Sequence, residues 1–221
     1  MKKELSTEDI KEIAAQLSCP SGENGVKIGN MMNETNVLMT INTVNSLELK
    51  DKENILEIGH GNCSHLTTLL QYAKGLSYSG LDISELMKKE AEMLNFGHIK
   101  KNVATFQLYD GVKIPFKDAN FHKIFTVNTI YFWKKPVLLL NEIYRVLKTG
   151  GQCSIAFAKK SFMEKLPFTA FGFKMYSAED IRNLIKHTPF ELVAIVDDSD
   201  QVKSKTDELV TREFSIVILK K

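Results

Sequence analysis

The stretch from Asn54 to Leu70, NILEIGHGNCSHLTTLL, decides the fold. Its apolar residues Ile55, Leu56 and Ile58 predict a buried strand, the glycines that follow predict a tight turn, and the later leucines predict a helix. Glycines at such a junction let the backbone approach a ligand, while the free N–H groups of the helix face the space above the turn. The sequence therefore predicts a ligand site at this turn.

The same alternation of strand and helix continues after this stretch, which predicts an α/β domain. Further strands are predicted at Tyr78–Ile83, Val103–Asp110, His122–Asn128 and Gly151–Ala158, with helices after Ser84 and over Val137–Lys148. The last two predicted strands, Phe190–Val196 and Phe214–Leu219, are joined by the polar segment Asp197–Arg212. This link is so short that the sequence does not establish a crossover helix between the two strands.

Composition indicates a single domain that binds a small molecule. The chain has 221 residues and 43% hydrophobic content, enough for one α/β domain with at most a small appendage. Its 29 basic and 27 acidic residues are spread along the chain, so we expect neither nucleic acid nor a membrane as partner. Three distant cysteines without a C-x-x-C pair, and the lack of a long apolar run, favour a soluble cytoplasmic protein.

The first fifty residues differ in character from the rest. A helix with apolar residues from Ile10 to Leu17 should end at Pro20, and a second should run from about Glu34 to Leu47. The segment between them, Ser21–Asn33, is either a surface loop whose methionines fill a gap in the core or a mobile lid that brings Met32 onto a substrate. We expect residues 1–50 to form a helical cap or lid and residues 51–221 the ligand-binding domain.

Acidic residues are predicted at the carboxyl ends of three strands. Glu57 precedes Gly59 by two residues, Asp82 ends the second strand, and Asp110-Gly111 ends the third. A carboxylate about 20 residues beyond a glycine turn can accept hydrogen bonds from both ribose hydroxyls of an adenosine. The alternatives are that Asp82 only precedes the helix cap and that Asp110-Gly111 is an ordinary turn.

Two segments carry a resemblance to a known family. Glu57, Gly59 and Gly61 resemble the E-x-G-x-G motif of class I S-adenosylmethionine-dependent methyltransferases, although Cys63 stands where that family usually has a third glycine. The segment Glu142–Gly151 is similar to the E-x-x-R-V-L-K-x-G-G segment of methyltransferases that include the ubiquinone and menaquinone C-methylating enzymes. The resemblance implies one doubly wound Rossmann-like domain with a seven-stranded, mostly parallel sheet whose last strand is antiparallel.

The resemblance also implies a cofactor and a set of site residues. S-adenosylmethionine would be the methyl donor, and the acceptor would be a small molecule. The methionine end of S-adenosylmethionine would lie at Glu57, Gly59 and Gly61, and its ribose at Asp82 and Ile83. Its adenine would lie at Asp110 and Gly111, and its methyl group near Asn128. Tyr131 and Trp133, which follow the fourth strand, are candidates for a substrate wall, with ordinary packing as the alternative, and Met32 is a third candidate substrate residue.

Two other function classes stay open at this stage. A Rossmann-type NAD-dependent oxidoreductase would share the glycine turn and Asp82, and a non-catalytic S-adenosylmethionine-binding protein would explain why no clear catalytic residue is found. Glu23 and Tyr131 are the candidate bases. The spacing of His60, Cys63 and His65 matches no metal-ligand motif, so no metal is expected. The acceptor and the oligomeric state cannot be deduced from the sequence.

Overall fold

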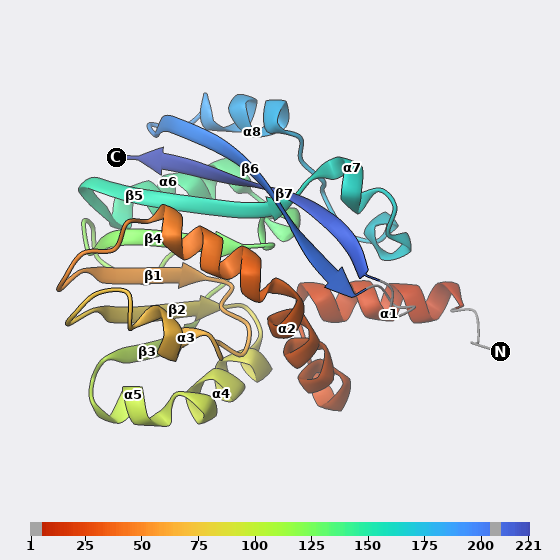
Figure 1. Ribbon diagram of the computed structural model, residues 1–221, viewed down its shortest axis with the longest axis horizontal. Helices are drawn as coiled ribbons and strands as arrows, with labels where there is room; N and C mark the ends of the chain where they lie inside the picture. The colour runs from red at the N-terminus through yellow and green to blue at the C-terminus, as the bar shows by residue number, and fades with distance from the viewer. Residues whose placement is uncertain (1–5, 204–208) are drawn as a thin grey trace.

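The computed structural model describes residues 6–203 and 209–221, and its centre is a seven-stranded sheet with the order β3-β2-β1-β4-β5-β7-β6 (Figure 1). The strands are β1 (Asn54–Ile58), β2 (Ser77–Asp82), β3 (Ala104–Leu108), β4 (Phe121–Val127), β5 (Leu147–Ala158), β6 (Glu191–Lys203) and β7 (Leu209–Lys220). Neighbours from β3 to β5 pair in parallel, and β7 is antiparallel to both β5 and β6. The predicted α/β fold, mostly parallel with an antiparallel last strand, is confirmed.

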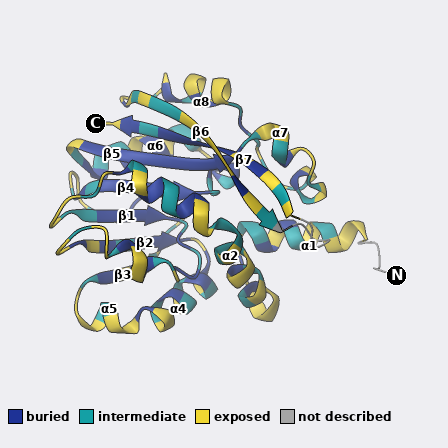
Figure 2. Ribbon diagram, in the orientation of Figure 1, coloured by how far each residue is buried: buried dark blue, intermediate teal, exposed yellow. Residues whose placement is uncertain are grey.

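Helices cover both faces of the sheet. They are α1 (Thr7–Ser18), α2 (Gly22–Ser46), α3 (Leu66–Leu69), α4 (Glu85–Leu94), α5 (Phe96–Lys100), α6 (Pro136–Val146), α7 (Lys160–Met163) and α8 (Ala178–Ile185), with short 3-10 helices η1 (Ile130–Phe132) and η2 (Pro167–Ala170). In Figure 1, α2 crosses the near face and α6 lies behind the sheet. The central strands are consequently buried on both faces (Figure 2), which explains the continuous apolar runs in β1 and β4.

Helix α2 differs from the prediction. We expected a loop over Ser21–Asn33 and a helix only from about Glu34, but one continuous helix runs from Gly22 to Ser46. Gly25 and Gly29 are packing positions within this helix rather than hinges. A Cβ atom at Gly25 would lie 2.7 Å from Cδ2 of Leu86, and one at Gly29 would lie 2.8 Å from Cε of Met87. Close packing against α4 therefore overrides the low helix propensity of glycine.

The C-terminal strands are also longer than predicted. The polar segment Asp197–Arg212 does not simply link two short strands, because β6 continues to Lys203 and β7 begins at Leu209. The extended hairpin carries a cross-strand pair, Asp200 opposite Arg212, that is buried against α2. A polar pattern that is paired in this way can form a strand although it lacks apolar alternation. The helix after the glycine turn, in contrast, is shorter than predicted and comprises only Leu66–Leu69.

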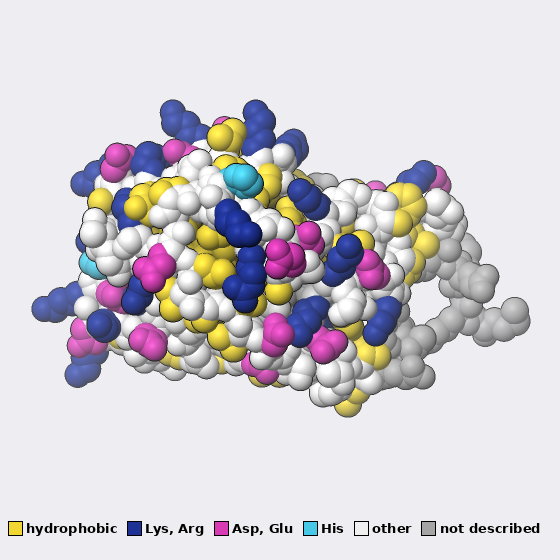
Figure 3. Space-filling model, turned by 90° about the horizontal axis from the view of Figure 1, so that it is seen from above, with side chains coloured by type: hydrophobic (Ala, Val, Ile, Leu, Met, Phe, Trp, Pro, Cys, Tyr) yellow, Lys and Arg dark blue, Asp and Glu magenta, His cyan; other side chains and the backbone are white. Residues whose placement is uncertain are grey.

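The described surface is mixed in charge. On the face shown in Figure 3, basic and acidic side chains are interspersed, and neither sign forms a continuous area. Among residues 6–203 and 209–221, the structure contains no helix with the length and apolar character that a bilayer crossing requires.

Candidate functional site

A cavity of about 550 Å³ lies at the carboxyl ends of the parallel strands. The C-terminal end of α1 and the middle of α2, from Gly29 to Thr40, contribute to its lining. The sequence-predicted residues that line it are Met32, Glu57, Gly59, Gly61, Asp82, Ile83, Asp110, Gly111, Asn128 and Trp133. Tyr131 is the exception, because it is buried beside the cavity without lining it. Residues that are distant in sequence therefore meet in one place, as ligand sites in open α/β sheets do.

The glycine turn forms the floor of this cavity. Gly59 and Gly61 have φ angles of +74° and +57°, in the left-handed region that favours glycine. A Cβ atom at Gly59 would overlap the Cγ2 methyl of Thr129, whereas one at Gly61 would meet no atom within 4 Å. Gly59 is thus required by packing and backbone conformation together, and Gly61 leaves open space on the cavity side.

Asp82 connects the end of β2 to the glycine turn. Its Oδ2 accepts a hydrogen bond from the Gly61 N–H (3.0 Å), and its Oδ1 accepts one from the Ser84 N–H (2.8 Å). Burial raises the pKa of the Asp82 carboxyl, while His60 and these N–H donors partly offset that rise. The result is a carboxylate that is held rigidly at the cavity wall, next to the backbone of the turn.

Glu57 is held from behind the turn. Its Oε2 accepts hydrogen bonds from the hydroxyl of Tyr78 (2.5 Å) and pairs with Nε2 of His65 (2.9 Å). Both hydrogen bonds that the structure describes for this carboxylate end on Oε2. Oε1 is therefore the oxygen that remains for a ligand in the cavity that Glu57 lines.

Glu57, Cys63 and His65 also bring three potential metal-ligand atoms within 4.8 Å of one another. Cys63 Sγ donates to the Tyr78 hydroxyl at 3.1 Å, and burial and the charge of Glu57 raise the pKa of the thiol well above its usual range. Metals bind the thiolate rather than the thiol, so this chemistry favours an internal hydrogen-bond network.

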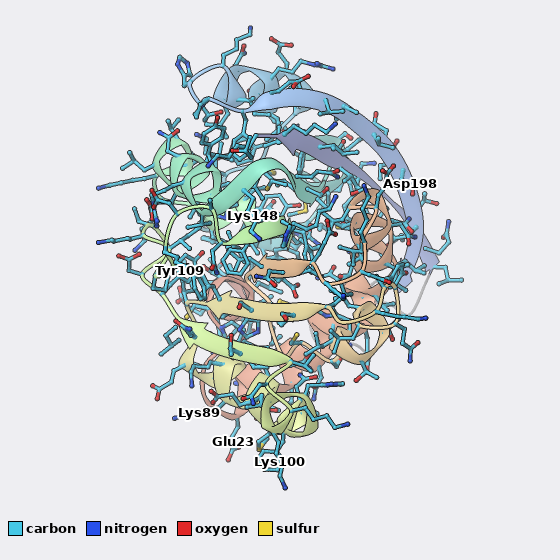
Figure 4. The ribbon with its side chains drawn as sticks, turned by 90° about the vertical axis from the view of Figure 1, so that its left-hand side faces the viewer. Glu23, Lys89, Lys100, Tyr109, Lys148 and Asp198 are labelled. Atoms are coloured by element: carbon cyan, nitrogen blue, oxygen red, sulfur yellow. The ribbon has the colours of Figure 1, made fainter. Side chains whose placement is uncertain are left out.

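At the end of β3, Asp110 caps the turn that follows it. Its Oδ1 accepts hydrogen bonds from the N–H groups of Val112 (2.8 Å) and Lys113 (2.7 Å), and these bonds lower the pKa of the carboxyl. Tyr109 lines the cavity beside Asp110 (the residue is labelled in Figure 4), and sequence reasoning missed it. Burial and the charges of Asp82 and Asp110 raise the pKa of this phenol, so it remains a hydrogen-bond donor at neutral pH.

Asn128 has φ of +57° and presents its side chain between the sheet and α2. Its Oδ1 accepts hydrogen bonds from the Tyr131 hydroxyl (2.9 Å) and the Ala158 N–H (3.2 Å), and its Nδ2 donates to Oδ1 of Asn36 (3.0 Å). Tyr131 also accepts a hydrogen bond from the Ala158 N–H, and burial raises the pKa of its phenol. Tyr131 therefore orients Asn128 rather than forming a substrate wall, and it is poorly suited to be a base.

Other lining residues were not predicted individually. They are Leu17, Ser18, Cys19 and Pro20 at the end of α1, Asn33, Asn36 and Thr40 on α2, and Phe132 and Lys134 near η1. Glu23, the other candidate base, does not line the cavity and points outward in Figure 4. The residues at the end of α1 and on α2 could not be found by motif, because they line the cavity only through the packing of these helices over the sheet.

Comparison with known proteins supports the same interpretation. Residues 56–155 match the family model described as a methyltransferase domain. YrhH of Bacillus subtilis (strain 168), which is named as a methyltransferase, is 30% identical over 115 residues, or 51% of this chain and 62% of YrhH. The chain thus aligns with about three fifths of the length of this relative.

Solved structures show the same fold over nearly the whole chain. A methyltransferase from Aquifex aeolicus, described as S-adenosylmethionine-dependent, has a TM-score of 0.66 at 18% identity and covers 96% of this chain and 99% of its own. The chain solved in complex with the Trm112 methyltransferase activator of Haloferax volcanii has a TM-score of 0.73 at 15% identity, with coverage of 96% and 99%. Residues 56–155 therefore form a methyltransferase domain, within a sheet that has the fold of class I S-adenosylmethionine-dependent methyltransferases.

Proposed function

We propose that this protein transfers a methyl group from S-adenosylmethionine to a small-molecule acceptor in the cavity. The observation that carries the proposal is the Asp82 carboxylate, which is buried at the cavity wall and joined to the Gly61 N–H of the glycine turn. S-adenosylmethionine is the donor that the matched methyltransferase domain implies, and its sulfonium makes the methyl carbon electrophilic. The protein's task is to hold both reactants in line and to exclude water.

The proposed donor-binding residues follow the cavity wall from β1 to β3. Glu57, through Oε1, would accept a hydrogen bond from the α-ammonium group, beside Gly59 and Gly61. Asp82, with Ile83 next to it, would accept hydrogen bonds from the ribose hydroxyls. Asp110 and Gly111 would lie at the adenine edge.

The acceptor would bind under the N-terminal helices, where Met32 and Trp133 line the cavity and Asn128 would lie near the reacting methyl group. We keep residues 1–50 as a cap over this end and residues 51–221 as the donor-binding domain. The support for a role of the cap is that the end of α1 and the middle of α2 contribute cavity-lining residues.

Ligand-dependent unfolding tests the proposal. S-adenosylmethionine and S-adenosylhomocysteine should raise the midpoint of thermal unfolding, whereas NAD and NADP should not. A ligand at 100 times its dissociation constant adds about 2.7 kcal/mol of stability. Asp82→Ala should lose most of this shift. Asp51→Ala is the matched control, because Asp51 is an exposed carboxylate that accepts a hydrogen bond from the Lys74 N–H outside the cavity.

An oxidoreductase would give the opposite pattern. If NAD or NADP stabilises the wild-type protein and both adenosyl compounds leave it unchanged, the proposed function is wrong. If the adenosyl compounds bind but no acceptor is ever methylated, the protein is a non-catalytic binder.

A further inference from the structure

The side-chain amide of Asn36 is held in one orientation by two independent constraints. Oδ1 of Asn128 is bound by the Ala158 N–H, so its Nδ2 must face Asn36, where it finds Oδ1 at 3.0 Å. Nη1 of Arg212, which can only donate, also approaches Oδ1 of Asn36 at 2.8 Å. Exchanging the oxygen and nitrogen of Asn36 would place donor against donor in both contacts.

Arg212 is itself fixed by the extended hairpin. Its guanidinium forms a two-point contact with the Asp200 carboxylate, with Nε–Oδ1 at 2.9 Å and Nη2–Oδ2 at 2.5 Å, and it donates to the Thr35 carbonyl at 2.9 Å. Both charged side chains are less than 10% exposed. The extended β6–β7 hairpin therefore reaches α2 and fixes the orientation of the Asn36 amide (Figure 1). A shorter hairpin would not bring Arg212 to this position.

The NH₂ group of Asn36 is left for the cavity. Asn36 lines the cavity, and among residues 6–203 and 209–221 no hydrogen bond is described for its Nδ2. Because the amide is planar and its oxygen is committed to Asn128 and Arg212, the nitrogen is the atom available to a bound molecule. Lys134, an exposed cation, also lines the cavity. The cavity thus offers a hydrogen-bond donor and a positive charge to an oxygen-bearing, preferably anionic, group.

The cavity offers the acceptor no base among the described residues. The carboxylates that line the cavity, Glu57, Asp82 and Asp110, belong to the donor-binding wall. His65 is paired with Glu57, and His60 has Nδ1 next to the Gly61 carbonyl while its Nε2 is fully buried.

The Cys19 thiol, at the end of α1, cannot take this role either, because burial and the charge of Asp82 raise its pKa. A nucleophile that must lose a proton to react, such as an alcohol or an ammonium group, would therefore find no proton acceptor.

We propose that the acceptor is a carboxylic acid with an apolar body, which the protein converts into its methyl ester. The inference rests on the proposed function and extends it. A carboxylate is already ionised at pH 7, so it needs no base. One carboxylate oxygen attacks the methyl carbon of the donor, the carbon–sulfur bond breaks with its electron pair remaining on sulfur, and the products are the ester and S-adenosylhomocysteine.

The remaining walls suit the body of such an acid. Leu17, Met32, Phe132 and Trp133 present apolar surface to the cavity, and the indole N–H of Trp133 is already donated to Thr129 Oγ1 at 3.1 Å. Hydrocarbon chains and rings gain stability by leaving water for such a surface. The Asn36 NH₂ would then hold the carboxylate at one end of the acid.

The first experiment compares acceptors of matched shape. The full chain is incubated with S-adenosylmethionine and octanoate, phenylacetate, octylamine or octanol, and products are identified by mass spectrometry. Methyl esters of the acids are expected, with no product from the amine or the alcohol. Methylation of only the amine or the alcohol would overturn the proposal, and so would failure to methylate any of the four by protein that binds S-adenosylhomocysteine.

The second experiment removes only the hydrogen-bond donor, the NH₂ group of Asn36. Asn36→Asp keeps an oxygen for Asn128 and Arg212 but replaces the NH₂ with a second oxygen. It should lower kcat/KM for the acid by about 10- to 100-fold, the range for loss of a hydrogen bond to a charged group, and leave the affinity for S-adenosylhomocysteine unchanged. Asn45→Asp, the same substitution at an exposed position of α2, should behave as wild type. Equal ester formation by Asn36→Asp and wild type would overturn the assignment.

A surface variant keeps the proposal testable if Asn36→Asp does not fold. Lys134→Gln alters an exposed side chain and should raise KM for the acid several-fold with little change in kcat. If folded wild-type protein neither forms ester nor binds S-adenosylhomocysteine, the failure lies in the proposed function. An unchanged KM with normal binding would overturn the role of positive charge in acceptor recognition.

Discussion

His65 and Glu57 form an ion pair behind the glycine turn, with Nε2 of the imidazole 2.9 Å from Oε2 of the carboxylate. Burial by itself would lower the pKa of His65, but the charge of Glu57 and the hydrogen bond to it raise the pKa above its ordinary value of 6.5. The pair joins the N-cap of the short helix α3 to the end of β1. It holds the carboxylate that we place at the methionine end of the donor.

The pair predicts a pH dependence of stability. Because the folded-state pKa of His65 is raised, its contribution is fully present below pH 6.5, the unfolded value, and is lost as the pH rises through the folded-state pKa. The difference in free energy of unfolding between wild type and His65→Gln should therefore be larger at pH 6 than at pH 9. Urea titrations at both pH values measure this difference, and a pH-independent value would contradict it.

His122 supplies a control of opposite sign. Burial and the nearby Lys148 lower the pKa of His122, whose Nδ1 accepts a hydrogen bond from the Asn54 N–H at 2.8 Å. Its contribution is present above pH 6.5 and is lost as the pH falls through the lowered folded-state value. The free-energy difference for His122→Gln should accordingly shrink on acidification, while that for His65→Gln should not.

The two glycines of the turn should differ in their tolerance of alanine. Gly61→Ala adds only the cost of a left-handed conformation, about 1–2 kcal/mol. Gly59→Ala adds that cost plus the overlap with Thr129, for which overpacking costs about 1–3 kcal/mol more. Chemical denaturation of both variants measures the difference, and equal destabilisation would show that Thr129 moves aside freely.

The buried pair of the hairpin should show strong coupling. Arg212→Met leaves Asp200 buried without a partner, and breaking such a pair costs about 3–5 kcal/mol. The double variant Asp200→Leu/Arg212→Met removes both charges and should recover most of that loss. Urea denaturation of the single and double variants tests this, and additive losses would mean that the two side chains are not coupled.

Cys19 should report directly on cavity occupancy. It is the exposed cysteine and lines the cavity, whereas Cys63 and Cys153 are buried. A maleimide should modify Cys19 alone in the native protein, and saturating S-adenosylhomocysteine should slow that reaction. Peptide mass spectrometry identifies the modified site. An unchanged rate with ligand bound would place the ligand away from the end of α1.

Motifs predicted one wall of the cavity and left the other unassigned. Glu57, Gly59, Gly61 and Asp82 follow from the alternation of strands and turns, because the carboxyl ends of parallel strands must meet at one edge of the sheet. Asn36, Cys19 and Tyr109 have no such signature. The place of Asn36 and Cys19 depends on how α1 and α2 pack, and even the helical state of residues 22–33 was predicted wrongly because contacts of Gly25 and Gly29 with α4 outweigh local propensity.

The sequence alone determined the sheet, the glycine turn and the acids that follow its strands, since short-range periodicity and turn chemistry encode these features locally. Tertiary structure alone decided the continuous α2, the length of the β6–β7 hairpin, and the hydrogen-bond chain from Asp200 through Arg212 to Asn36. The physical reason is that these features depend on contacts with distant parts of the chain, as between Gly29 and Met87 of α4 or between Arg212 and Asn36, which are 176 positions apart. Such contacts stabilise conformations that the local sequence does not favour.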